Sequence, residues 1–189
     1  MNNTPHLQQT NDDSQATFAQ IVDQWQGMVY NTALSMVQNH EDAEDITQEV
    51  FIDVFENLSG FKQQATLKTW IYRITVNKTL DWLKKKNRQK HGGLLKRVFL
   101  IKDQDEPISF YHPGAALDNK ENAAALFKAL KQLPPKQQAV FTLHKIEGLP
   151  YAEIAGIMNT TVNAVEALMM RAKNGLRKIL ETHYMHQNG

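Results

Sequence analysis

The residues best suited to contact a nucleic acid lie between positions 70 and 88. At helical spacing, one face of this segment presents Trp70, Arg73, Asn77, Asp81, Lys84 and Arg88. Cations neutralise phosphates, and an exposed ring can stack on a base for about 1–3 kcal/mol. The alternative is that Trp70 is a core residue covered by Phe61 or the preceding loop. The aromatic ring beside a lysine run favours a surface for an exposed single strand of nucleic acid. A lysine run alone has another explanation, because cations also stabilise the C-terminal end of a helix dipole.

Acidic side chains form a stripe along the helix expected at 41–58. Helical spacing places Asp42, Asp45, Glu49, Asp53 and Glu56 opposite the apolar Ala43, Ile46, Val50, Val54 and Leu58. The usual interpretation of such a charge run is a solvated face. This helix, however, carries no Lys or Arg for i,i+4 pairing, and the apolar Ile52 lies beside the stripe with Gln48. The pattern favours a docking surface for a basic protein.

Residues 151–165 match a helix-turn-helix. Ala155 is small where two helices would cross, Asn159 tolerates a positive φ in the turn, and Val165 can pack back on the first helix. The final helix would then expose Asn163 and Glu166, which can contact adenine and cytosine edges in a major groove, while Arg171 and Lys173 suit phosphates. The alternative is a helical hairpin without DNA contact, because the first exposed turns carry one acidic side chain and no basic side chain.

Composition and charge limit the function classes. The 189 residues contain no cysteine, which excludes disulfides, thiol nucleophiles and thiolate zinc sites and favours a reducing compartment such as the cytoplasm. No apolar run reaches the roughly 18 residues that a membrane span requires. Residues 18–60 include eight Asp or Glu and no Lys or Arg, whereas residues 61–97 include eleven Lys or Arg and one Asp. This asymmetry suggests one cationic partner and one polyanionic partner.

The elements that must position these residues are helices. Apolar spacing is helical from Phe18 to about Lys90 and from about Asn119 to His183, with no alternating strand pattern. We therefore predict an all-α fold of two small helical domains, 18–90 and 119–183, joined by a flexible linker at 91–118 that is rich in breakers. Residues 1–17 are expected to form a disordered tail and 184–189 a second tail. Helices are predicted near 15–38, 41–58, 66–89, 121–131, 136–146, 151–158 and 162–182.

These segments together resemble a known family, the extracytoplasmic-function (ECF) sigma factors of bacterial RNA polymerase. The resemblance rests on Asp42 to Phe51, on Phe61 to Thr66 followed by Thr69 to Ile74 and Asn77, and on motifs between Ala129 and Lys173. It implies that 18–90 is sigma region 2, which binds core polymerase and melts the minus-ten element. It also implies that 119–183 is region 4, whose helix-turn-helix contacts the minus-thirty-five element.

The resemblance assigns residues to three surfaces. Core polymerase binding is expected at Asp42, Asp45, Gln48, Glu49 and Ile52. Minus-ten DNA is expected at Phe61, Lys62, Gln63, Gln64, Ala65, Thr66, Trp70, Arg73, Asn77, Lys84 and Arg88. Minus-thirty-five DNA is expected at Thr160, Thr161, Asn163, Ala164, Glu166, Ala167, Met170, Arg171 and Lys173.

The recognition helix departs from the family pattern. Glu166, Ala167 and Leu168 stand where many members carry Lys, Ser and Arg, so phosphate-driven affinity for the minus-thirty-five element should be reduced. Asn159 replaces a common turn glycine, and Pro150 replaces a Ser or Thr cap.

The expected partners are core RNA polymerase, promoter DNA and an anti-sigma factor or another recruiting or inhibiting protein, without membrane insertion. The sequence predicts no catalytic residues, cofactor or metal, since His183 and His186 have metal-compatible spacing but no third ligand. The alternative function is a helix-turn-helix regulator whose acidic N-terminal domain binds a signalling protein.

Overall fold

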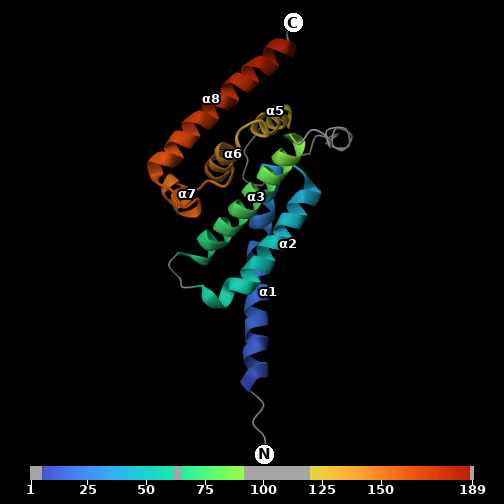
Figure 1. Cartoon of the computed structure of the whole chain (residues 1–189), viewed down its shortest axis with the longest axis vertical. Coiled ribbons are helices and arrows are strands. Elements are labelled where there is room, and N and C mark those ends of the chain that lie inside the picture. Colours follow the sequence, from blue (N-terminus) through green and yellow to red (C-terminus); the bar gives the residue numbers. More distant parts are fainter. Residues whose placement is uncertain (1–5, 62–64, 92–119, 188–189) are drawn as a thin grey trace, which may run out of the picture.

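All regular secondary structure in the described part of the chain is helical (Figure 1). The computed structural model describes residues 6–61, 65–91 and 120–187, with side chains for 18–61, 65–88 and 123–182. The predicted all-α class is confirmed, with no strand in these ranges. The expected linker, apart from His91 at the end of α3, lies outside the described residues.

The N-terminal lobe consists of three packed helices. They are α1 (His6–Val37), α2 (His40–Asn57), which continues into the short 3-10 helix η1 (Leu58–Gly60), and α3 (Leu67–His91). The chain turns between α1 and α2 at Gln38, which has a φ of 53°, and Asn39 caps α2 by accepting a 2.8 Å hydrogen bond from the Asp42 backbone. The core contains Val29, Ala43, Ile46, Val50, Val54 and Ile71, each at most 2% exposed.

The C-terminal lobe contains four α-helices and one π-helical segment. These are α5 (Lys120–Leu130), α6 (Pro135–Phe141), the π-helical η2 (Thr142–Ile146), α7 (Tyr151–Ile157) and α8 (Val162–Gln187). Pro135 lies at the first position of α6, where a missing backbone N–H is harmless. The long α8 packs on α5, α6 and α7 and holds the lobe together.

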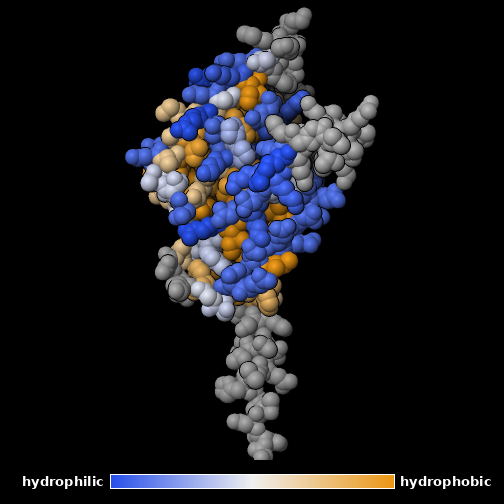
Figure 2. Space-filling model, viewed as in Figure 1, coloured by the Kyte–Doolittle hydropathy of each residue, from blue (hydrophilic) through white to orange (hydrophobic). Residues whose placement is uncertain are grey.

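A single apolar cluster joins the two lobes. Met36, Val76 and Leu80 of the N-terminal lobe pack in one core with Leu143 and Ile154 of the C-terminal lobe. In Figure 1, α6 and α7 lie along α3, and both contact it. The lobes are therefore docked on each other. The outer face of the molecule drawn in Figure 2 is mostly hydrophilic, with hydrophobic residues visible between the hydrophilic ones.

The ends of the chain are more helical than the sequence predicted. The expectation of a disordered tail over 1–17 is wrong from His6 onward, because α1 begins there. No Gly or Pro lies between His6 and Gln26, so nothing ends the helix that packs from Phe18 onward. The tail expected at 184–189 is likewise wrong up to Gln187, where α8 ends. Val162, the first residue of α8, is 39% exposed.

The predicted helix-turn-helix is present as α7, a turn and α8. Asn159 has a φ of 49° in the turn, and Ala155 and Val165 are 6% and 0% exposed. Thr161 caps α8, since its hydroxyl accepts a 3.2 Å hydrogen bond from the Ala164 backbone. The turn thus fixes the angle at which α8 leaves α7.

Asn159 supplies the first test of this geometry. Asn159→Gly should leave the free energy of unfolding unchanged or raise it by up to about 1 kcal/mol, because glycine adopts the left-handed region without strain. Asn159→Val should lower it by about 1–2 kcal/mol, because a β-branched residue is strained there. Urea denaturation measures both, with Thr160→Val as the neighbouring control. Equal stabilities for the two Asn159 variants would contradict the left-handed turn.

Candidate functional site

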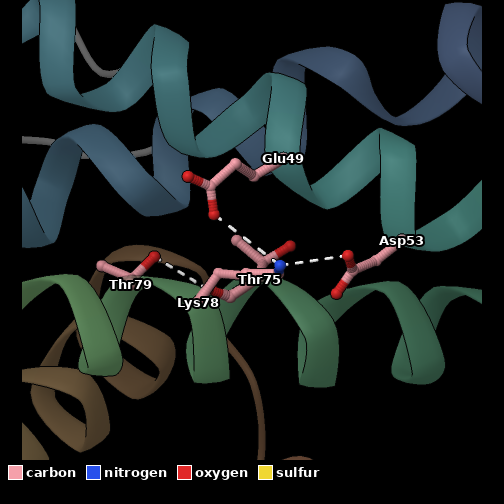
Figure 3. Close-up of polar contacts among 5 residues, drawn as sticks. All are labelled: Glu49, Asp53, Thr75, Lys78 and Thr79. Carbon is pink, nitrogen blue, oxygen red and sulfur yellow. Dashed lines mark hydrogen bonds and ion pairs between the residues drawn. The ribbon is translucent and has the colours of Figure 1, made fainter.

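Two lysines of α3 pair with the acidic stripe of α2, and Figure 3 shows the first of them, Lys78. Lys78 Nζ lies 3.0 Å from Asp53 Oδ1 and 3.7 Å from Glu49 Oε2. Lys86 Nζ lies 3.1 Å from Asp42 Oδ2 and 4.4 Å from the centre of the Trp82 ring. The expectation of an unpaired stripe is therefore wrong for three of its acids. Their cations come from the neighbouring helix, which spacing along α2 could not reveal.

The pairing has a simple electrostatic consequence. The hydrogen bond to Asp53 raises the pKa of Lys78 above its ordinary 10.5; partial burial opposes this, and the charges of Asp53 and Glu49 add to it. Lys78 therefore stays charged at neutral pH and holds α3 against α2.

The buried hydroxyl of Thr79, next to this lysine, has its partner within α3. It donates a hydrogen bond to the Thr75 carbonyl over 2.8 Å (Figure 3).

Part of the stripe remains open. Asp45 and Gln48 are exposed, and no ion pair to Asp45 occurs within the described residues. Ile52 is 56% exposed and Phe55, which the sequence analysis missed, is 54% exposed. The Phe55 ring packs edge-on to Phe18 at 5.0 Å. An acidic surface with two exposed apolar side chains is left on α2.

A hollow lies between the end of α2 and the start of α3. It has a volume of about 400 Å³ and is lined by Asp53, Asn57, Gly60, Phe61, Ala65, Trp70, Arg73 and Ile74. The Phe61 and Trp70 rings lie 5.0 Å apart, so Phe61 does pack on Trp70, and the half-buried Trp70 still lines the hollow. The size and the aromatic wall suit a planar ring. Asp53 and Asn57 were not expected here, because only the fold brings them beside Trp70.

Further along α3, Asn77, Lys84 and Arg88 are exposed, and Lys84 forms a 2.9 Å ion pair with Asp81. Thr66 is exposed and accepts a 3.1 Å hydrogen bond from the Thr69 backbone. Lys62, Gln63 and Gln64 lie outside the described residues. The structure therefore brings Phe61, Ala65, Trp70 and Arg73 together around the hollow and places the other described cations along the same helix.

Two neighbours on α3 reach the other lobe. The Arg73 guanidinium donates a 2.8 Å hydrogen bond through Nη2 to the Gly156 carbonyl of α7. The Tyr72 hydroxyl donates over 3.0 Å to Glu147 Oε2. Burial, followed by the charge and hydrogen bond of Glu147, raises the pKa of Tyr72, so its hydroxyl remains a donor at all ordinary pH values. The face expected to meet DNA is thus partly engaged by α7.

The exposed face of α8 carries most of the residues expected for duplex DNA. Asn163, Glu166, Met170, Arg171 and Lys173 are exposed, with Met170 at 63%. Thr160 and Thr161 are exposed in the preceding turn, whereas Ala164 and Ala167 are half-buried. A helix presented in this way can enter a major groove.

Comparison with known proteins decides the family. Residues 21–89 match Sigma-70 region 2, and residues 123–176 match Sigma-70 region 4. The chain is 30% identical over 182 residues to the ECF RNA polymerase sigma factor SigW of Bacillus subtilis, covering 92% of this chain and 94% of the relative. The chain belongs to the ECF RNA polymerase sigma factors. This family holds transcription initiation factors, and the match to both regions weighs against the alternative of an ordinary helix-turn-helix regulator.

A second relative carries the same family name, and a solved structure has a similar fold. The chain is 33% identical over 165 residues to the ECF RNA polymerase sigma factor SigE of Mycolicibacterium smegmatis, covering 87% of this chain and 62% of the relative's length. The fold is similar to that of the sigma factor RpoE in a complex with the anti-sigma factor NepR from Bartonella quintana, with a TM-score of 0.66 at 22% identity over 87% of this chain and 97% of the other. No helix within the described residues is long and apolar enough to span a membrane.

The pairing between α2 and α3 can be tested through stability. Lys78→Met should lower the free energy of unfolding by about 0.5–1 kcal/mol near pH 7 in low salt, as expected for a partly exposed ion pair. Because folding raises the pKa of Lys78, its stabilisation is full below pH 10.5 and is lost as the pH rises through the higher folded value. Urea denaturation with Lys84→Met as the control measures the difference. Equal losses in both variants would contradict a special role for Lys78.

Proposed function

We propose that this sigma factor binds core polymerase through the open part of the α2 stripe. Asp45, Gln48, Ile52 and the newly found Phe55 combine exposed charge with exposed apolar area. Such a surface suits a basic, partly apolar helix of a partner. Asp42 and Glu49 contribute less, because Lys86 and Lys78 already pair with them.

The hollow beside Trp70 is the proposed site of minus-ten recognition. A base extruded from the duplex needs an aromatic wall and polar groups for its edge, and Trp70, Phe61, Asp53 and Asn57 supply both. Lys84 and Arg88 lie farther along α3, where cations can follow the phosphates of a displaced strand. This combination of an aromatic hollow with a basic helix is the observation that carries the proposal.

The exposed face of α8 is the proposed contact with the minus-thirty-five element. Asn163 and Glu166 are placed for base edges, and Arg171 and Lys173 for phosphates. With few cations on this face, we infer weak binding to duplex DNA unless polymerase holds the lobe in place.

The chain acts by binding and positioning, and we infer no enzymatic activity of its own. A protein that works with RNA polymerase on promoters acts in the cytoplasm. Two neighbours in fold were solved in complexes, RpoE with the anti-sigma factor NepR and CnrH with the cytosolic domain of CnrY. We infer that an inhibiting protein of this kind also binds this chain. Run-off transcription with purified core polymerase, with and without this protein, tests the function as a whole.

The α2 surface makes a specific prediction. Asp45→Lys should weaken co-purification with core polymerase at least tenfold, because it reverses an exposed charge at the proposed contact. Asp23→Lys reverses an exposed charge on α1 instead of α2 and serves as the control. Helicity by circular dichroism should be unchanged in both. If Asp45→Lys binds core as tightly as the control, α2 does not dock there.

The hollow makes a second prediction. Trp70→Ala should retain closed-complex formation and lose most of the permanganate reactivity of thymines at the start site, because the stacking wall for the extruded base is gone. Trp82→Ala is the matched control, since Trp82 is also half-buried on α3 but lies against Lys86 outside the hollow. Unchanged reactivity in Trp70→Ala would mean that Trp70 only packs.

A further inference from the structure

The exposed face of α8 is ordered into a central stripe with a flank on each side. Successive residues of a helix are turned by about 100° around its axis. The side that packs on the lobe is defined by Val165, Met169, Ala172 and Leu176, each at most 5% exposed. Away from it, exposed residues recur at spacings of three, four and four along one line, and they are Asn163, Glu166, Met170 and Asn174. These four residues form the central stripe.

One cation lies on each side of the central stripe. Arg171 and Lys173 are exposed and two positions apart, so their side chains are turned about 160° from each other, on opposite sides of Met170. A helix in a major groove has a phosphate backbone on either side. Arg171 and Lys173 can therefore contact the two strands at once, which leaves the central stripe facing the base edges.

The stripe itself combines an acidic and an apolar side chain and holds no cation. Glu166 is exposed and forms no ion pair in the described part of the chain. Met170 is 63% exposed on the next turn. Neither side chain gains from a phosphate, since a carboxylate is repelled by it and a thioether is apolar. Their favourable contacts in a groove are with the bases.

The chemistry of the base edges decides which bases suit these two residues. A carboxylate only accepts hydrogen bonds, so Glu166 needs an amino group at the major-groove edge. Cytosine presents its amino group beside a C–H, whereas adenine presents one beside the N7 acceptor, which would face the second carboxylate oxygen. Guanine and thymine present only acceptors there. The apolar group that the major groove offers to Met170 is the 5-methyl of thymine.

We propose that Glu166 selects a cytosine and Met170 a thymine in the minus-thirty-five element, while Arg171 and Lys173 hold the two strands on either side. The inference rests on the proposed function of α8 and gives it a base preference. Glu166 and Met170 are about 6 Å apart along the helix, and base pairs repeat every ~3.4 Å. The cytosine and the thymine should therefore lie about two base pairs apart.

The first experiment tests Glu166 through run-off transcription by the holoenzyme on a promoter that it uses. Each base pair of the minus-thirty-five element is replaced in turn by the other three, and the wild type should favour cytosine about tenfold at one position. Glu166→Gln should move this preference to adenine, because an amide both donates and accepts and so matches the adenine amino group and N7. Glu181→Gln removes an exposed charge about three turns beyond Met170 and is the matched control.

The second experiment tests Met170 with deoxyuridine, which lacks only the 5-methyl group of thymine. Single replacements of thymine along the element should lower run-off transcription by the wild type about fourfold at one position, about two base pairs from the selected cytosine. Met170→Gln has a similar length but a polar end, so it should be insensitive to the replacement. Met170→Leu keeps an apolar end and should retain the sensitivity.

Two results would overturn the proposal. Glu166→Gln could keep the wild-type base preference, or deoxyuridine could act equally on the wild type and on Met170→Gln. All the substituted side chains are exposed, so circular dichroism should show unchanged helicity in every variant. Absence of run-off on every template, or run-off that responds to no change in the minus-thirty-five element, would instead count against the proposed function.

Discussion

Helix α3 has to pack against two pairs of helices at once and leave a third face exposed, and the arrangement of the molecule follows from this constraint. One side meets α1 and α2, where Ile71 enters the core and Lys78 pairs with Asp53 and Glu49. Another side meets α6 and α7, where Val76 and Leu80 are buried. The remaining side carries the exposed Asn77, Lys84 and Arg88. Because a helix presents its faces at fixed spacing, rotation of α3 against one pair of helices would also change its contact with the other pair and the direction of its exposed face.

Helix positions could be predicted because their signals are local. Apolar side chains recur at helical spacing, and Asn39, Gly60, Pro134 and Gly148 lie at the breaks between elements. The buried face of α2 was predicted in the same way, and Ala43, Ile46, Val50 and Val54 are indeed at most 2% exposed. The left-handed turn at Asn159 also follows from residue type alone. The ends of α1 and α8 were missed because polar residues without breakers can extend a helix beyond its packed part.

Contacts between helices could not be predicted from spacing within one helix. The acids of α2 lack cations on their own helix, yet α3 supplies Lys78 and Lys86. Asp53 and Asn57 reach the hollow only because the end of α2 folds beside Trp70. Burial of Tyr72, Gln38 and Gln138 depends on docking of the two lobes, which no local pattern in either lobe encodes.

Docking of the lobes leaves some faces of the chain open and engages others. Asp45, Gln48 and Ile52 on α2, the surface proposed for polymerase, are exposed while α7 contacts α3. The cations of α3 would otherwise attract any nucleic acid, since phosphate neutralisation does not depend on sequence. The hydrogen bond from Arg73 to the Gly156 carbonyl engages one of these cations in the contact between the lobes. The exposed face of α8 carries few cations. Arg73 therefore serves the contact between the lobes as well as lining the hollow beside Trp70.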